Sequence, residues 1–118
     1  MTIQELNHKY NFHDSSIINI DYSSEKKQLI IILIFCYWAQ TWYKEGDPEL
    51  MKLQVTMDGI ESYDGPSGRI DYYGIGNDEI IDGNYHLFVM NDFEQKYYDF
   101  YLRPTEVKIE ILEQFNEE

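Results

Sequence analysis

Residues 29–38 read Leu-Ile-Ile-Ile-Leu-Ile-Phe-Cys-Tyr-Trp and form the most apolar stretch of the chain. The stretch is rich in β-branched residues and is apolar at both odd and even positions, which is typical of a strand inside a sheet. With Ala39 included, it has only about half the length of a membrane-spanning helix. Lys26 and Lys27 place charge beside this aggregation-prone segment. We therefore expect a central β-strand here.

Alternating patterns on either side of this stretch predict further strands. Residues 51–57 alternate strictly between apolar and polar side chains, as expected for a half-buried strand that ends at the Asp58-Gly59 bend. Similar patterns predict strands at 16–22, 85–90, 98–102 and 107–111. In the first of these, the period of two places Ile18, Ile20 and Tyr22 on one face.

The remaining segments are less regular. Thr2 and Glu5 have the spacing of a capping box, which predicts a short helix ending near Lys9. Residues 62–84 hold five of the seven glycines and predict an irregular surface segment, functional or merely connecting, with short edge strands at 69–73 and 79–82. The polar residues from Glu113 onward predict a frayed tail.

These elements predict a single mainly β domain over residues 1–118. About six or seven strands follow one another with turn signals every 8 to 15 residues, which favours an antiparallel sheet or β-sandwich over βαβ units. The hydrophobic fraction of 43% is close to that of globular proteins, so we do not expect disorder.

The charge balance points to the kind of partner. The chain has 22 Asp and Glu residues against 9 Lys and Arg, a formal net charge of −13. Such a charge repels nucleic acids and anionic membranes and attracts basic proteins, although it can also serve solubility alone. One cysteine allows no internal disulfide, and the polar residues after Met1 do not resemble a signal peptide, so we expect a cytoplasmic protein.

No group of residues has the pattern of a catalytic or metal site. Cys36 lies in the most apolar segment, where we expect a buried, unreactive thiol. His13 and Asp14 are better explained by a turn in which the histidine bonds a nearby carbonyl. The acids of the glycine-rich segment lack the spacing of a calcium loop. We therefore expect no enzyme activity, no metal and no cofactor.

Tyrosines beside acidic residues are the features that best suit protein binding, because tyrosine anchors interfaces and acids steer a basic partner. The residues that we expect to contact such a partner are Asp71, Tyr72, Tyr73, Asp78, Glu79, Asp82, Tyr97, Asp99 and Tyr101.

The aromatic cluster at 37–43 supports a different hypothesis. Trp38, Trp42 and Tyr43 could stack on a carbohydrate or another small ligand. They could equally pack at the end of a core strand or contact a protein. A carbohydrate-binding or small-ligand-binding β-sandwich is therefore the alternative function.

The chain resembles a class of small bacterial proteins in the order of certain short motifs. An aromatic-His-Asp-Ser segment at 12–15 precedes a hairpin, and the final strands read Tyr-Asp-Phe-Tyr-Leu at 98–102 and Val-Lys-Ile-Glu-Ile at 107–111. Some similar small acidic proteins are immunity proteins of polymorphic toxin systems, which bind and neutralise a toxin made by the same cell. The resemblance implies a non-enzymatic inhibitor of a basic toxin, such as a nuclease, and assigns no catalytic residue.

Overall fold

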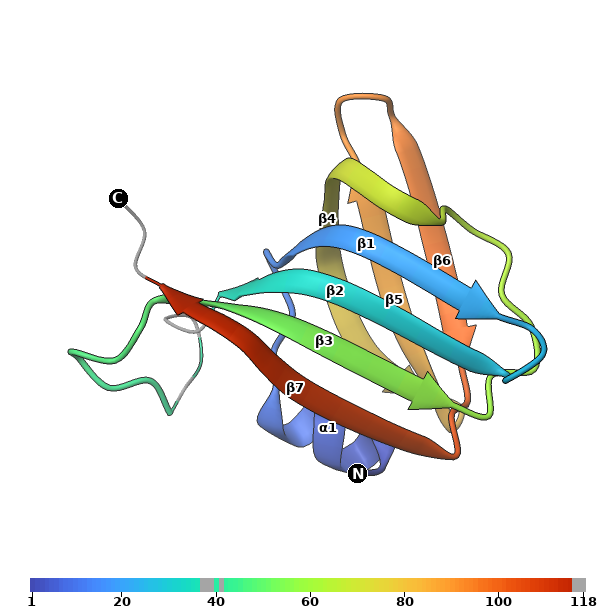
Figure 1. Ribbon diagram of the computed structural model, residues 1–118, viewed down its shortest axis with the longest axis horizontal. Coiled ribbons are helices and arrows are strands. Elements are labelled where there is room, and N and C mark those ends of the chain that lie inside the picture. Colours follow the sequence, from blue (N-terminus) through green and yellow to red (C-terminus); the bar gives the residue numbers. More distant parts are fainter. Residues whose placement is uncertain (37–39, 41, 116–118) are drawn as a thin grey trace.

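The computed structural model describes residues 1–36, 40 and 42–115, and it describes the side chains of these residues except Asp71 and Tyr72. The described residues form one helix and seven strands (Figure 1): α1 (Ile3–Lys9), β1 (Ser16–Ser23), β2 (Gln28–Cys36), β3 (Leu50–Asp58), β4 (Gly68–Ile81), β5 (Asn84–Asn91), β6 (Lys96–Leu102) and β7 (Glu106–Phe115). The predicted mainly β fold and the short N-terminal helix are confirmed.

All seven strands belong to one antiparallel sheet in the order β6-β5-β4-β1-β2-β3-β7. β4 connects its two halves, because residues 68–74 pair with β1 and residues 74–81 pair with β5. The sheet curls at β4, so that β1, β2, β3 and β7 form a front layer and β5 and β6 lie behind it (Figure 1). The interior position predicted for residues 29–38 is confirmed for β2, whose described part ends at Cys36.

The core fills the space inside the curl. The strict alternation of β2 and β3 turns every second side chain inward, including the fully buried Leu33 and Leu53. One small internal void of about 10 Å³ is lined by side chains from both layers: Phe12, Ile31, Leu33, Val55, Met57, Ile75, Tyr85 and Leu87. The two layers therefore share one hydrophobic core.

The helix packs against the connecting strand β4 and the edge strand β7. Thr2 and Glu5 form the predicted capping box, with each side chain bonding the other residue's backbone amide. Ile3 and Leu6 are buried in the core, and α1 contacts both β4 and β7. The helix thus covers part of the curl that the strands leave open.

The prediction that Ile18 and Ile20 share one face of the first strand is wrong. A bulge lies between Ile17 and Asn19, so that Ile17 and Ile20 are both buried while Ile18 is half-buried. Ile18 therefore does not share the inner face with Ile20. Three neighbouring isoleucines hide such a bulge, because shifting the pattern by one residue exchanges one isoleucine for another.

Two further predictions, for the glycine-rich segment and for the C-terminal residues, are wrong. Residues 68–81 form one continuous strand of 14 residues in the interior of the sheet, where short edge strands are predicted. It ends in an Asp82-Gly83 turn whose φ angles of 50° and 79° suit a tight hairpin. Glu113 pairs with Lys52 and continues β7 to Phe115, where a frayed tail is predicted.

Candidate functional site

The outer side of β4, β5 and β6 carries a set of aromatic and acidic side chains in regular rows. The strand register aligns Glu79 with His86 and His86 with Tyr101. The next row aligns Phe88 with Asp99, and the one after it aligns Met90 with Tyr97. We call this surface the tyrosine face and define it as Glu79, His86, Phe88, Met90, Tyr97, Asp99 and Tyr101.

His86 is the centre of the tyrosine face. Its side chain is only 10% exposed, and its ring stacks on that of Tyr101 with centroids 4.6 Å apart. Nε2 lies 2.8 Å from Asp99 Oδ1, and because an ionised carboxylate only accepts hydrogen bonds, Nε2 carries the hydrogen. Nδ1 lies 3.5 Å from Glu79 Oε1. The histidine thus holds one carboxylate, faces a second and supports a tyrosine ring.

Phe88 and Tyr97 form the second part of the tyrosine face. Their rings are parallel, with an angle of 2° between planes and centroids 6.2 Å apart. Gly76 on β4 leaves room for this pair, since a Cβ atom there would lie 2.9 Å from Phe88 Cδ2. The exposed tyrosine therefore rests on an aromatic ring that a glycine accommodates.

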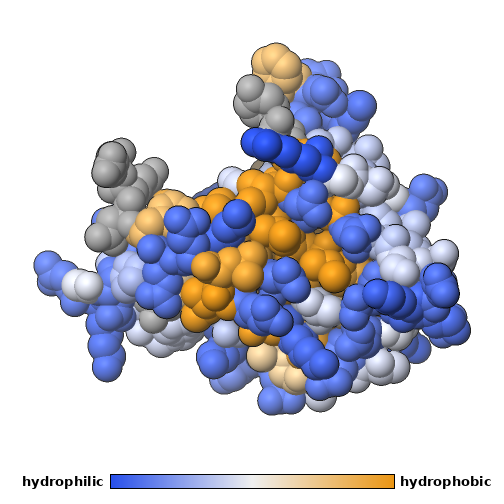
Figure 2. Space-filling model, viewed as in Figure 1, coloured by the Kyte–Doolittle hydropathy of each residue, from blue (hydrophilic) through white to orange (hydrophobic). Residues whose placement is uncertain are grey.

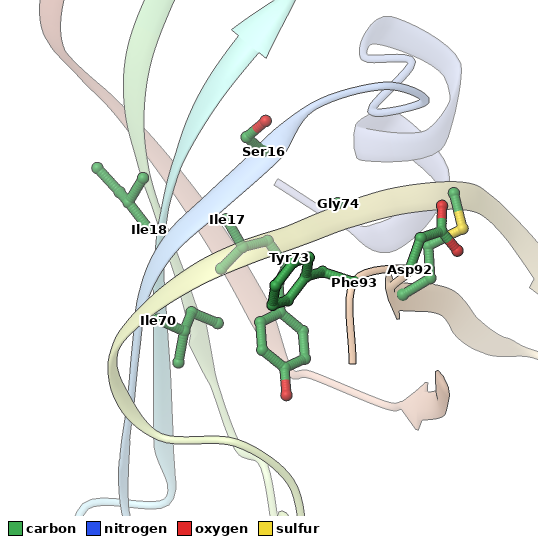
Figure 3. Close-up of a pocket in the computed structure, with 9 residues that line it drawn as sticks. Ser16, Ile17, Ile18, Ile70, Tyr73, Gly74, Asp92 and Phe93 are labelled. Carbon is green, nitrogen blue, oxygen red and sulfur yellow. The ribbon is translucent and has the colours of Figure 1, made fainter. Parts of the chain in front are cut away.

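A hollow of about 390 Å³ adjoins the tyrosine face (Figure 3). It lies between β1, β4 and the β5–β6 turn and is lined by Ser16, Ile17, Ile18, Ile70, Tyr73, Gly74, Met90, Asp92 and Phe93. Met90 belongs both to this hollow and to the tyrosine face. Apolar walls with one carboxylate, that of Asp92, suit the long aliphatic stem and charged end of a lysine or arginine.

The structure brings four of the nine predicted partner-binding residues together on the tyrosine face, namely Glu79, Tyr97, Asp99 and Tyr101. Of the others, Tyr73 is 9% exposed and lines the hollow, Asp78 points inward, and Asp82 lies in the β4–β5 turn. The side chains of Asp71 and Tyr72 lie outside the described part of the structure.

Asp78 has a structural task. Its Oδ1 accepts a hydrogen bond from the Phe12 amide at 3.2 Å, and its Oδ2 accepts one from the Tyr85 hydroxyl at 3.0 Å. Burial raises the pKa of the Asp78 carboxyl, and the two hydrogen bonds oppose that rise. Burial likewise raises the pKa of Tyr85. Asp78 therefore ties the segment after α1 to the back layer.

The aromatic cluster of the alternative hypothesis lies apart from the tyrosine face. Trp42 donates from Nε1 to the Lys9 carbonyl at 2.9 Å, and its ring meets Tyr10 edge-on at 6.4 Å. The Tyr43 hydroxyl donates to the Asp47 carbonyl at 3.1 Å. Trp38 lies outside the described residues. Both described members thus have hydrogen bonds within the chain, and Trp42 attaches its loop to the end of α1.

The residues considered for chemistry have structural contacts. His13 Nδ1 bonds the carbonyl of Gly76 on β4, so the predicted bond to a carbonyl is present, but its partner lies on a distant strand and not within the turn itself. Cys36 is half-buried, with Sγ 3.4 Å from the Asp14 carbonyl, so the prediction of a buried thiol is wrong. The reason is that the even positions of β2 face outward. Among the side chains that the structure describes, no three from His, Cys, Asp or Glu are arranged to hold a metal ion.

Three members of the tyrosine face were not singled out from the sequence: His86, Phe88 and Met90. Their signal is the alternation of the strand at 85–90, in which Tyr85, Leu87 and Val89 are the inward residues. Pairing this strand with the next one through the turn after Asn91 would have placed all three beside the tyrosines of β6.

No protein-family model, curated protein or solved structure matches the chain. The resemblance to immunity proteins therefore stays a prediction. In the part of the chain that the structure describes, no helix has the length and apolar character needed to cross a membrane.

Proposed function

We propose that this protein binds a basic protein through the tyrosine face and acts as an immunity-type inhibitor of a basic toxin. The observation that carries the proposal is the grouping of exposed tyrosines and carboxylates on one sheet surface. Tyr97 and Tyr101 are 55% and 57% exposed, and the side chain of Asp99 between them is 55% exposed. The net charge of −13 adds a long-range attraction for a positively charged partner.

The composition of the tyrosine face suits a tight interface. Tyrosine contributes a large contact area with few rotatable bonds, so that little side-chain entropy is lost on binding. Glu79 and Asp99 attract lysine and arginine side chains and raise the rate of encounter with a positively charged partner. A basic toxin would therefore meet both long-range attraction and aromatic anchors.

The tyrosine face is also rigid before binding. Tyr101 stacks on the buried His86, and Tyr97 rests against Phe88. Both tyrosines lie on β6, whose backbone is paired along its length with β5. A preorganised surface loses less entropy on binding than a flexible loop does, which supports binding as the role of this surface.

Inhibition would follow from occlusion. A toxin that acts on nucleic acid needs a basic active-site surface, and an acidic protein that covers this surface would exclude the substrate. Such an immunity protein would act in the cytoplasm of the toxin-producing cell.

Affinity capture from the native host at low salt tests the proposal. The wild-type chain should recover a basic protein, whereas a Tyr97→Ala/Tyr101→Ala variant should recover at least tenfold less of it. An Asp99→Asn variant should also bind more weakly, and its loss should shrink as salt screens the attraction. Glu25→Gln, in the exposed β1–β2 turn, is the matched control and should bind as the wild type does.

Two results would contradict the proposal. One is the recovery of no basic protein by the wild-type chain at low salt. The other is equal recovery by the wild type and the double tyrosine variant, which would place the binding surface elsewhere. The circular dichroism spectrum and melting temperature of each variant should be recorded, so that loss of binding is not confused with loss of fold.

A further inference from the structure

The front layer has an outer surface quite unlike the tyrosine face. Ile30, Ile32 and Ile34 point outward from β2, and Ile18 stands beside them at the bulge of β1. All four are half-buried. Figure 2 shows hydrophobic surface at the centre of this side of the molecule. We call these four residues the isoleucine face.

No described element covers the isoleucine face. The helix and the back layer lie on the inner side of the front layer (Figure 1). An antiparallel sheet with one side in water normally carries polar residues there, whereas β2 carries apolar residues on both sides, as a strand does when both its sides are buried. Contiguous exposed apolar surface with a polar rim marks an interaction site.

The strand register shows how charges are distributed around the isoleucine face. One row runs across five strands from Arg69 on β4 through Asn19, Ile32 and Gln54 to Glu110 on β7. Arg69 and Glu110 therefore stand two strands away from Ile32, on opposite sides of it. Both are exposed, and neither forms an ion pair within the described residues.

We propose that the isoleucine face binds a second copy of this chain, with a two-fold axis that runs along β2 in the plane of contact. This rotation places β2 of one copy on β2 of the other. It lays the half of the sheet toward β4 in one copy on the half toward β7 in the other copy. Arg69 of each copy then faces Glu110 of the other, so that two opposite-charge pairs flank the isoleucines. A symmetric pairing of one patch with itself is the commonest arrangement in homodimers.

The neighbouring rows agree with this axis. The row through Ile30 carries Asp21 on β1 and Thr56 on β3, so the rotation places Asp21 against a hydroxyl. The row through Ile34 carries Ser16 and Lys52 in the same two positions, so Lys52 also faces a hydroxyl. No like charges face each other in these three rows.

The other simple two-fold axis is disfavoured. A two-fold axis that runs across the strands through Ile32 would place each strand on the same strand of the second copy. Arg69 would then face Arg69 and Glu110 would face Glu110, which costs free energy on both sides. The charges therefore select the axis along β2.

The overall charge opposes association and the local charges favour it. Two copies of net charge −13 repel each other at long range, but this repulsion is screened beyond about 8 Å at physiological ionic strength. Burial of the isoleucines is not weakened by salt in this way. The tyrosine face of each copy lies on the other layer of the molecule and stays exposed in the dimer. The proposed dimer therefore does not depend on the proposed toxin binding.

Sedimentation equilibrium of the full chain over a concentration series in 0.15 M sodium chloride tests the proposal. The wild type should be a dimer, and Ile32→Glu should be monomeric because it places two carboxylates at the axis. Arg69→Glu and Glu110→Arg should each weaken the dimer about tenfold, since each creates two like-charge contacts.

The combination of the two charge changes is the decisive variant. Arg69→Glu/Glu110→Arg keeps the net charge of −13 and restores opposite-charge pairs, so it should dimerise about as well as the wild type. Glu110→Arg alone makes the chain less negative overall, so weaker association of this variant cannot come from net charge.

Three outcomes would overturn the proposal. A wild-type chain that stays monomeric at all concentrations would do so directly. A dimer that ignores all the substitutions would lie on another surface. A dimer in which the double charge variant is as weak as each single variant would reject the two-fold axis along β2.

Discussion

The front and back layers share one core, yet their outer surfaces differ in kind. The outer side of β2 carries Ile30, Ile32 and Ile34, whereas the outer sides of β5 and β6 carry His86, a phenylalanine, one carboxylate and two exposed tyrosines. The inner residues of both layers are almost uniformly aliphatic or aromatic. The inner positions therefore determine the fold, and the outer positions determine what each layer can bind.

The largest expected difference in stability is between substitutions at two neighbouring residues of β2. Leu33 is 2% exposed in the core, so Leu33→Ala should lower the free energy of unfolding by about 3 kcal/mol. Ile32→Thr replaces one outward β-branched residue with another, so it should lower the free energy of unfolding by less than about 1 kcal/mol in dilute solution. Urea unfolding measures both. Equal losses would mean that the outer side of β2 is buried within one chain.

Asp78 contrasts with the exposed acids of the surface. Asp78→Ala leaves the Phe12 amide and the Tyr85 hydroxyl without their acceptor, which should cost about 2 kcal/mol in unfolding free energy. Asp64→Ala, at an exposed position, is the matched control and should change stability by less than about 0.5 kcal/mol. A neutral Asp78→Ala would show that these two bonds do not stabilise the fold.

Gly76 tests how strongly the tyrosine face depends on its packing. Gly76→Ala would place a Cβ 2.9 Å from Phe88 and push that ring away from its position against Tyr97. We expect a loss of about 1 kcal/mol in stability and weaker binding of the basic partner. Gly76→Ala should therefore bind more weakly than the wild type while keeping the wild-type circular dichroism spectrum. Equal binding by Gly76→Ala and the wild type would contradict this packing role of Gly76.

The smallest expected effect is on the pH dependence of stability. Because burial raises the pKa of Asp78 above its ordinary value of 3.8, the folded chain binds this proton more tightly than the unfolded chain does. As the pH falls through the raised pKa toward 3.8, the wild type should therefore gain stability relative to Asp78→Asn.

Unfolding free energies of both proteins between pH 7 and pH 4 check this sign. Above the raised pKa of Asp78, the difference between the two proteins should be constant. A difference that moves in the opposite direction on acidification would mean that the hydrogen bonds from Tyr85 and Phe12 outweigh burial.

The sequence predicts the parts of the fold in which inner and outer residues differ in polarity. Residues 51–57 alternate apolar and polar side chains, and they form β3 as predicted. The bulge at Ile18 could not be predicted, because an isoleucine precedes it and another follows two residues later. β4 was obscured by Gly74 and Gly76, which indicate a loop in a sequence but here lie within a strand.

The candidate site was predicted only in part, because it is made by pairing between strands. Tyr97, Asp99 and Tyr101 share one strand, so their common face follows from the period of two. Their proximity to Glu79 and His86 depends on the register of β4, β5 and β6. That Tyr73 and Asp78 turn inward depends on the same register, which no local pattern specifies.

Chemical-shift mapping tests the division between the two outer faces most directly. The basic protein recovered by affinity capture should be titrated into the ¹⁵N-labelled full chain, and the amide shifts of all described strands compared. We expect the largest changes at 97–101 and 86–90, with none at 30–34. Changes centred on 30–34, or spread evenly over both layers, would contradict the assignment of partner binding to the tyrosine face.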